Sequence, residues 1–232
     1  MPAMPNVTLY QYEISPFSDK VRRVLKLKGI DYSVYEVLPS KASKLKHISP
    51  SGKFPAMQWD DTLIVDSTDI IALLDNEVPT PALIPTDPKA RALAHILEDW
   101  ADESLYFYDI AIRAKEHNVA LLAEDICRHD TGLMSGIIKK ALPGAMRKSA
   151  NVQGLGRKSA VVLARDIEAH FAALEALLDG SDWLVGDALS IADIAVGSML
   201  HVLIRAKEPA QSLPIFTRLS AWKERLDKLT LA

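Results

Sequence analysis

The alternation of apolar and polar residues near the start of the chain predicts a strand that leads directly into a helix. Residues 7–12 alternate between two faces, which is typical of a half-buried strand. One face has Val7 and Leu9, and the other has Thr8, Tyr10 and Tyr12. Helical spacing follows, at Phe17, Val21, Val24 and Leu25. Ser15 can cap this helix, Pro16 suits its first position, and Gly29 suits its end.

The segment up to residue 77 predicts the rest of a small α/β unit. Residues 31–37 alternate as a second strand, and the basic segment 41–47 suits a short helix. Pro55 marks the entrance of a third strand, because proline is disfavoured inside a central strand, and its peptide bond is a candidate for the cis form. A tight turn at Asp60-Asp61 leads to an antiparallel fourth strand. A helix then begins at Asp66-Ser67, with Ser67 as its cap.

This order of elements predicts how the unit is built. A parallel pair of strands is joined by a crossover helix, and an antiparallel hairpin and a covering helix follow. The segment 77–88 contains four prolines and reads as a linker. We therefore place one domain at residues 1–77, the linker at 78–87 and a second domain at 88–232.

Beyond the linker the spacing of apolar residues turns helical. The predicted helices cover residues 89–113, 119–126, 159–178, 190–206 and 216–229. The fourth of them is apolar nearly all round, which predicts a buried helix. Its start has a capping box, because Asp193 lies three residues after Ser190 and can reach back to its N–H. We interpret Ser190 and Asp193 as structural residues, and the second domain as all-helical.

Composition and charge narrow the class of protein. The chain has 232 residues, 49% of them apolar, and a net charge of −3, which predicts neither a nucleic-acid partner nor a membrane partner. Its one cysteine, Cys127, excludes an internal disulfide framework and favours a reducing compartment. Without the pattern of a signal peptide or a bilayer-spanning run, a cytoplasmic location is expected. The six histidines show no metal-ligand spacing, so no metal is expected.

The junction between the first strand and the first helix is the part of the chain that best fits a chemical site. A helix N-terminus has unpaired backbone N–H groups and a partial positive charge. It can hold an anion such as a thiolate or a carboxylate. Ser15 lies at this helix N-terminus. Considered by itself, a serine at this position is explained by a role as helix cap.

Four segments together resemble the glutathione S-transferase family. Ser15-Pro16-Phe17-Ser18 is similar to the segment with the catalytic residue in its serine and cysteine types. The other three are Lys53-Phe54-Pro55 at the cis-proline, Asp66-Ser67 at the γ-glutamyl site, and the run from Leu184 to Asp193 at the core helix. The resemblance covers both halves of the chain. It implies an α/β thioredoxin-like N-terminal domain followed by an all-α C-terminal domain.

The resemblance also implies a role for each matching residue. Ser15 would donate a hydrogen bond to the glutathione thiolate and, with the helix dipole, lower the pKa of the thiol. Phe17 and Pro55 would complete this part of the glutathione site, and the backbone of Phe54 would bind the cysteinyl amide. Ser67 would bind the γ-glutamyl carboxylate and Asp66 the α-amine, with a reach one methylene shorter than the usual glutamate. Lys53 and Lys41 would meet the glycyl carboxylate.

Other residues compete for the catalytic role. Tyrosine-type members use a tyrosine near the end of the first strand, where Tyr10 and Tyr12 flank Gln11. Ser18 stands where a glutaredoxin has its second cysteine, and we interpret it as an ordinary helix serine. Since a hydroxyl cannot form a mixed disulfide, thiol–disulfide exchange is not expected.

The acceptor substrate is the least defined part of the prediction. Trp100 and Tyr106 are our candidates for lining its pocket. No acidic residue lies between Asp130 and Asp166, and the cations of the segment 139–165 form either a solvated face or a site that favours an anionic acceptor.

Three classes of function stay open. The first is a transferase that conjugates glutathione, its co-substrate, to a small electrophile. The second is a non-catalytic binding or scaffold protein, because a fold does not fix a function. The third is a glutathione-dependent isomerase or peroxidase, which needs the same thiolate. The presence of Ser15, Asp66 and Ser67 together favours a working glutathione site. The family also implies a homodimer.

Overall fold

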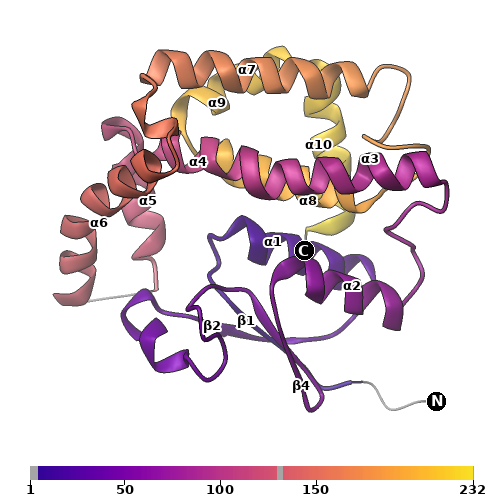
Figure 1. The fold of residues 1–232 in the computed structure, drawn as a ribbon, viewed down its shortest axis with the longest axis horizontal. Coiled ribbons are helices and arrows are strands. Elements are labelled where there is room, and N and C mark those ends of the chain that lie inside the picture. The colour runs from indigo at the N-terminus through magenta and orange to yellow at the C-terminus, as the bar shows by residue number, and fades with distance from the viewer. Residues whose placement is uncertain (1–4, 130–132, 232) are drawn as a thin grey trace. The chain divides into compact units, whose positions relative to one another are not determined.

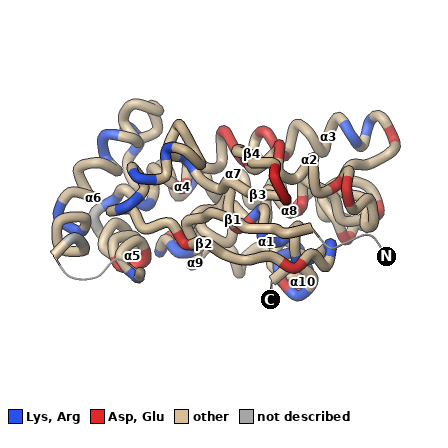
Figure 2. Tube along the Cα trace, turned by 90° about the horizontal axis from the view of Figure 1, so that it is seen from below, with Lys and Arg blue, Asp and Glu red and all other residues tan. Residues whose placement is uncertain are grey.

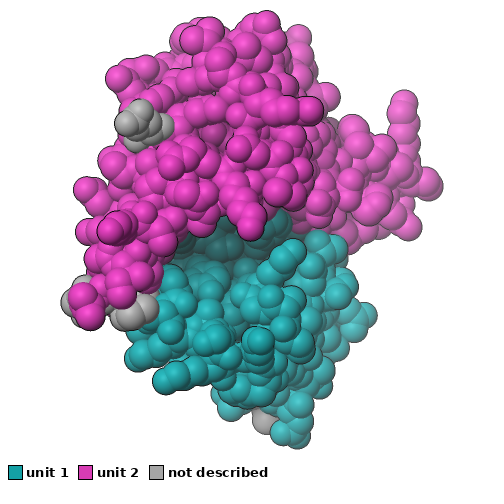
Figure 3. Space-filling view, turned by 60° about the vertical axis from the view of Figure 1, so that its left-hand side comes forward, with its two compact units in different colours: residues 1–83, 228–232 teal, residues 84–227 magenta. Residues whose placement is uncertain are grey.

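The computed structural model describes residues 5–129 and 133–231, and the chain forms two compact units. The sheet unit comprises the residues up to Leu83 together with those from Lys228 onward, and the helical unit comprises Ile84–Asp227 (Figure 3). The last residues of the chain thus belong to the first unit. Residues 1–4, part of the segment that argued against a signal peptide, lie outside the described residues.

The sheet unit has the predicted order of elements (Figure 1). They are β1 (Val7–Gln11), α1 (Pro16–Leu27), β2 (Ser33–Glu36), the 3-10 helix η1 (Pro39–Leu45), β3 (Ala56–Trp59), β4 (Thr62–Val65) and α2 (Ser67–Glu77). The strand order is β2-β1-β3-β4, with β1 parallel to β2 and the other pairs antiparallel. The predicted parallel pair, hairpin and covering helix are confirmed. The short basic helix predicted at 41–47 corresponds in part to η1, which is a 3-10 helix, begins two residues earlier and ends at Leu45.

The core of the sheet unit follows the alternation seen in the sequence. Val7, Leu9 and Gln11 of β1 are buried, and the residues between them are only partly buried. Apolar side chains of α1 and α2 complete this core, among them Val21, Val24, Leu25, Ile70 and Leu74. At the other end of the hairpin the two-residue turn has Asp60 at a φ of 49°, the left-handed conformation that such turns require.

One face of α1 differs from the sequence-based expectation. Asp19, Lys20 and Arg23 are buried together with the apolar residues, whereas Phe17 is only partly buried. Burying charged groups is tolerated when they are paired. The Arg23 Nε donates to Asp19 Oδ2 at 2.6 Å and Nη1 to Thr230 Oγ1 at 2.8 Å. These contacts bring the C-terminal residues onto the sheet unit.

Among the described residues, the helical unit contains the five predicted helical regions, two further α-helices and two short 3-10 helices. Its elements are α3 (Pro88–Asp99), the π-helix η2 (Trp100–Leu105), α4 (Tyr106–Arg113), α5 (Glu116–Ile126), α6 (Leu133–Val152), η3 (Leu155–Arg157), α7 (Ala160–Leu177), α8 (Ile191–Leu203), α9 (Lys207–Ser212), η4 (Leu213–Ile215) and α10 (Thr217–Thr230). The predicted helix 89–113 is continuous but contains the π-helical turn. In the described part of the chain, no helix combines the length and apolar character needed to cross a bilayer.

The capping box of α8 is present and organises the centre of the helical unit. The Oδ2 of Asp193 accepts from the N–H of Ser190 and from its hydroxyl, both at 2.9 Å. The Oδ1 accepts from the N–H of Leu184 and from Nε1 of Trp222, also at 2.9 Å. Burial raises the pKa of Asp193, and these four hydrogen bonds work against that shift. The contacts agree with the structural role predicted for this residue.

Candidate functional site

The candidate site begins at the N-terminus of α1, where Ser15 is the helix cap. Its backbone is extended, and its Oγ accepts the N–H of Ser18 at 3.4 Å. Pro16 occupies the first helical turn, as predicted. Because the hydroxyl oxygen acts only as an acceptor here, the hydroxyl proton remains available to a ligand. The partly buried Ser15 thus couples a hydrogen-bond donor to the positive end of α1.

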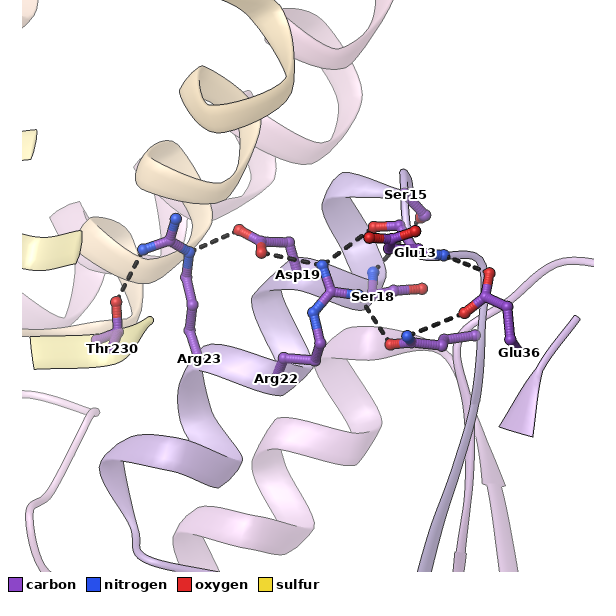
Figure 4. A network of polar contacts seen from close by, with 9 residues as sticks. Glu13, Ser15, Ser18, Asp19, Arg22, Arg23, Glu36 and Thr230 are labelled. Carbon is purple, nitrogen blue, oxygen red and sulfur yellow. Dashed lines mark hydrogen bonds and ion pairs between the residues drawn. The ribbon is translucent and has the colours of Figure 1, made fainter. Parts of the chain in front are cut away.

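A network of polar contacts fixes the loop that presents Ser15 (Figure 4). The Glu36 carboxylate, at the end of β2, accepts from the N–H of Glu13 at 2.7 Å and from Nε2 of Gln11 at 3.1 Å. Arg22 of α1 donates to Gln11 Oε1 at 2.8 Å, to the carbonyl of Glu13 at 3.1 Å and to Asp19 Oδ1 at 3.0 Å. Two strands and a helix therefore hold the loop from both sides.

Replacing Glu36 by glutamine is expected to loosen this loop. The amide would place an N–H₂ group against one of the two N–H donors that the carboxylate now accepts, at a cost of about 1–3 kcal/mol of folding free energy. Urea unfolding measures this cost, and calorimetry with glutathione measures any loss of affinity. The matched control is Glu77→Gln, at an exposed position at the end of α2. Equal unfolding curves for the wild type and Glu36→Gln would show that the network does not stabilise the loop.

The N-terminus of α2 provides a second position for an anion. Asp66 caps this helix through Oδ1, which accepts from the N–H of Thr68 at 2.9 Å, so the predicted cap at Ser67 is wrong. Ser67 is the first helical residue because Asp66 has a φ of 87° and turns the chain into the helix. The Ser67 side chain is buried, and its hydroxyl makes no hydrogen bond within the described part of the chain. A hydroxyl with no hydrogen-bond partner among the described residues, beside a helix N-terminus, fits the predicted carboxylate contact.

Lys20 links the two helix N-termini. Its side chain is completely buried on α1, and its Nζ donates to Thr68 Oγ1 on α2 at 3.4 Å. The sequence analysis did not identify Lys20, Arg22 or Glu36, because helical periodicity treats charged positions as exposed. The only signal was the pairing of parallel strands, which aligns Glu36 with Gln11 once the register is known.

The segment before β3 lies next to the loop that carries Ser15. The Phe54–Pro55 peptide bond is cis, as considered from the sequence. The Phe54 ring contacts the Tyr12 ring edge-on, with the centroids 5.5 Å apart, and Ala56 pairs with Tyr10 across the sheet. This arrangement places Phe54 beside the end of β1, where its predicted backbone contact would be made.

The tyrosine alternative gains no support from these contacts. Tyr10 packs against Tyr35 of the neighbouring strand at a centroid distance of 5.2 Å, and Tyr12 packs against Phe54. Burial and the charge of Glu36 raise the pKa of Tyr12, so its phenolate is disfavoured. Ser15 remains the better candidate for activating a thiol.

The remaining predicted contacts of the sheet unit are exposed or partly buried. Phe17 lies in the first turn of α1 and is partly buried, whereas Lys41, on η1, and Lys53, just before the cis-proline, are both exposed. The Lys53 carbonyl accepts from Ser49 Oγ at 2.6 Å, which fixes its backbone and leaves its ammonium group in solvent. The roles of these three residues stay predictions.

The helical unit places the two predicted acceptor residues in different surroundings. Trp100 packs on His170 of α7, with centroids 5.3 Å apart, and Tyr108 packs on the same imidazole at 4.9 Å. Tyr106 lies instead on the face of α4 that carries Asp109 and Arg113, and burial raises the pKa of its phenol. The π-helical turn between them changes the rotation of the helix, which periodicity alone does not reveal.

His170 gives this aromatic group a pH dependence. Burial lowers the pKa of His170, with the nearby charge of Lys158 acting in the same direction and that of Asp166 against it. The unfolded chain therefore binds a proton near pH 6.5, where the folded chain does not, and stability falls as the pH drops through that value. Thermal unfolding between about pH 7 and 5 should show a smaller loss for His170→Phe than for the wild type. The exposed His95→Phe is the control, and equal losses in all three proteins would contradict the prediction.

The cations of the segment 139–165 are divided between two environments. Lys139, Lys140, Arg147 and Lys148 are exposed on α6, and none has an ion-pair partner among the described residues. Figure 2 shows the Lys and Arg positions of α6 in blue. Lys158 and Arg165 instead pair with Asp166, at 2.6 and 3.0 Å. Arg157 of η3 is exposed and donates to the Gly154 carbonyl at 3.0 Å, without an ion-pair partner among the described residues. The hypothesis of an anionic acceptor therefore rests on the cations of α6 and on Arg157, and stays a prediction.

Chemically, the sheet unit offers two helix N-termini linked by a buried lysine, with serine hydroxyls at both. This arrangement suits a small molecule that carries more than one anionic group. A thiol bound at Ser15 would be stabilised as the thiolate. No cluster of three or more potential metal ligands occurs in the described ranges 5–129 and 133–231.

Comparison with known proteins relates both units to one family. Residues 9–82 match the family model "Glutathione S-transferase, N-terminal domain", and residues 140–225 match "Glutathione S-transferase, C-terminal domain". A glutathione S-transferase of Triticum aestivum is 27% identical over 214 residues, which are 91% of this chain and 85% of the relative. A maleylacetoacetate isomerase of Mus musculus is 34% identical over 97 residues, 39% of this chain and 45% of that enzyme.

The fold also matches a solved structure. Rice GST1, determined in complex with glutathione, superimposes with a TM-score of 0.69, covering 97% of this chain and 88% of the rice chain. The two sequences are 20% identical, so this similarity concerns the fold. Both units of the chain are thus related to the same family by sequence models, and the whole chain is related to it by fold.

Proposed function

We propose, because this chain belongs to the glutathione S-transferase family, that it binds glutathione and activates its thiol for transfer to a small electrophile. In this reaction the thiolate sulfur attacks an electrophilic carbon, a C–S bond forms, and the leaving group departs with its electron pair. The thiol proton passes to solvent when glutathione binds. The protein's part is to bind glutathione, orient its sulfur and keep the thiolate at neutral pH.

The observation that carries this proposal is the geometry of Ser15. Its hydroxyl oxygen accepts the N–H of Ser18, and the hydroxyl proton is free to be donated to a ligand. The hydroxyl lies at the positive end of α1, a helix of twelve residues. Donation to a thiolate, together with the helix charge, lowers the pKa of the bound thiol. The network around Glu36 and Arg22 supports the proposal because it holds the backbone of Glu13, in the loop that leads to Ser15.

The other contacts follow from the same placement. Ser67 and the N-terminus of α2 would bind the γ-glutamyl carboxylate, and Asp66 the α-amine. The backbone of Phe54 beside Pro55 would bind the cysteinyl amide, with Lys53 and Lys41 at the glycyl carboxylate. We propose the acceptor contacts on the helical unit, at Trp100 and Tyr106.

An isomerase is the second candidate, favoured by the match to maleylacetoacetate isomerase. There the thiolate would add to a carbon–carbon double bond, the new single bond would rotate, and elimination would return glutathione unchanged. The same thiolate serves both reactions. The two differ in whether glutathione is consumed.

The assembly and location belong to the proposal as well. Leu93 and Ile96 of α3 are exposed, at 38% and 61%, which is consistent with a surface that a second copy covers. We propose a homodimer in the cytoplasm, as the family implies.

A single pair of assays tests the proposed function. The purified protein is incubated with glutathione and an electrophile that has a good leaving group, and in parallel with a cis-configured unsaturated diketo acid. Loss of free thiol in the first assay supports the transferase, and a change of double-bond geometry without loss of thiol supports the isomerase. Inactivity in both, with glutathione bound, would favour a non-catalytic binding protein.

A further inference from the structure

A buried ion pair in the helical unit lacks the hydrogen bonds that such pairs normally make. Asp109 and Arg113, one turn apart on α4, are only 2% and 6% exposed. The Arg113 Nε lies 3.3 Å from Asp109 Oδ1, without the alignment of a hydrogen bond. Both carboxylate oxygens, and the Nε and Nη1 of the guanidinium, have no hydrogen-bond partner in the described part of the chain.

The chain itself provides a comparison for this pair. Asp19 and Arg23 have the same spacing on α1 and similar burial, but they meet at 2.6 Å, and Arg23 also donates to Thr230 at 2.8 Å. Asp193, which is completely buried, accepts four hydrogen bonds. Asp109 has equal burial and none. The carboxylates of Asp19 and Asp193 thus accept hydrogen bonds, whereas neither oxygen of Asp109 does, although Nη2 of Arg23 also lacks a partner in the described part of the chain.

Such a pair brings the fold little stability. Burying two charges costs free energy that their attraction recovers only when the remaining donors and acceptors are also satisfied. Burial raises the pKa of Asp109 even though Arg113 acts against the shift, which agrees with incomplete compensation. A buried charged pair that lowers the stability of the fold and makes no hydrogen bonds within it is a candidate for binding a ligand.

The surroundings of the pair also favour a binding role. Tyr106 lies on the same face of α4 and is only partly buried. It lies close to the pair, because the charges of Asp109 and Arg113 both act on the pKa of its phenol. The π-helical turn Trp100–Leu105 directly precedes it, and such turns frequently occur at functional sites. Movement of the Tyr106 ring would open the pair to a small molecule.

We propose that Asp109 and Arg113 bind a small neutral molecule that has a hydrogen-bond donor next to an acceptor, as in a primary carboxamide or a hydroxycarbonyl group. The N–H groups of Arg113 would donate to the carbonyl oxygen, and the adjacent N–H or O–H of the ligand would donate to Asp109. One such ligand satisfies both halves of the pair without adding a net charge to the interior.

This inference deepens the proposed function and rests on it for its role in turnover, because it names the class of acceptor. Arg113 and Asp109 would select electrophiles that carry a carboxamide or hydroxycarbonyl group. Binding itself does not depend on glutathione chemistry, so the two claims are tested separately.

The binding test uses benzamide and N,N-dimethylbenzamide, which differ in the N–H donor. Calorimetry without glutathione should show the wild type binding benzamide at least about tenfold more tightly than its dimethyl analogue. Asp109→Leu/Arg113→Met, an apolar replacement of similar size, should lose this preference. Arg113→Lys keeps the charge but not the planar fork, and it should lose the preference as well.

Thermal unfolding separates a binding role from a structural one. Asp109→Leu/Arg113→Met is expected to unfold at the same temperature as the wild type or a higher one, because an unsatisfied pair is replaced by apolar packing. The matched control is Asp19→Leu/Arg23→Met, which removes a hydrogen-bonded pair at the same spacing and should unfold at a lower temperature. A lowered unfolding temperature for the α4 variant, or equal affinity of the wild type for the two benzamides, would overturn the proposal.

Turnover then distinguishes failure of this inference from failure of the proposed function. The electrophiles are 2-chloroacetamide and 2-chloro-N,N-dimethylacetamide, each of which would form a C–S bond with glutathione and release chloride. A preference for the first in the wild type, lost in Arg113→Lys, supports both claims. A benzamide preference without turnover of either electrophile leaves the site standing and removes the transferase. Equal turnover of both electrophiles leaves the transferase standing and overturns the role of the pair in selecting the acceptor.

Discussion

Replacing Ser15 by alanine is expected to leave glutathione bound but to abolish most of its activation. The variant loses the hydroxyl that would donate to the thiolate, while the helix N-terminus and the contacts at Ser67 remain. Loss of one such donor lowers turnover by about 10²–10³-fold in comparable sites. The pKa of the bound thiol, measured from thiolate absorbance, should return toward that of free glutathione.

Two further variants control for the second role of Ser15 as a helix cap. Loss of the cap costs about 1 kcal/mol of stability in Ser15→Ala, which urea unfolding measures separately. Ser15→Thr retains a hydroxyl and a cap, and it should retain most of the activity. Ser18→Ala removes a buried hydroxyl that has no partner among the described residues, and it should behave like the wild type. Full activity of Ser15→Ala would exclude Ser15 as the activating residue.

Replacing Asp193 by alanine is expected to cause the largest loss of stability. The change removes the acceptor of four hydrogen bonds at the start of α8 and leaves the Leu184 and Ser190 N–H groups and the Trp222 indole unsatisfied in the interior. Leaving buried donors without acceptors is one of the mechanisms behind very large mutational effects, and we expect about 3–5 kcal/mol.

The measurement is urea unfolding with Asp187→Ala as the matched control, since Asp187 is an exposed acid a few residues earlier in the chain. The control should differ little from the wild type. An effect of Asp193→Ala below about 1 kcal/mol would mean that water replaces the lost carboxylate, and that the capping box does not organise the helical unit.

The order of elements could be predicted because local signals agree with the fold. The strand alternation at β1, the Pro16 start of α1, and the Ser190–Asp193 capping box each have a local physical cause. Long helices with a clear apolar face, such as α7, were found to within two residues at each end. These signals do not depend on distant parts of the chain.

The missed elements lack such a signal. α6 contains Pro143 and two glycines, residues that normally argue against a helix, and its apolar positions form no clear stripe. Contacts with neighbouring helices override these preferences. The π-helical turn has no recognisable pattern either, and it separates Trp100 from Tyr106 although one helix was predicted to carry both.

At the candidate site, the residues that touch a ligand were easier to predict than those that position them. Ser15 and Asp66 stand at helix starts, which the sequence marks by capping residues. Glu36 and Arg22 reach the same loop through strand register and side-chain direction, which require the folded sheet. The contribution of the Ser67 hydroxyl and of Lys20 to the site can be recognised only when the fold places α1 and α2 side by side.

The most direct test of the account is whether glutathione releases its thiol proton when it binds. Wild-type protein is titrated with glutathione by calorimetry near pH 7, in buffers that differ in ionisation enthalpy. A free thiol has a pKa of about 8.5, so activation by Ser15 predicts release of nearly one proton for each glutathione bound. Binding without proton release would indicate a glutathione-binding protein that does not activate the thiol. No binding at millimolar glutathione would contradict the proposal that this protein binds and activates glutathione, and would favour a scaffold role.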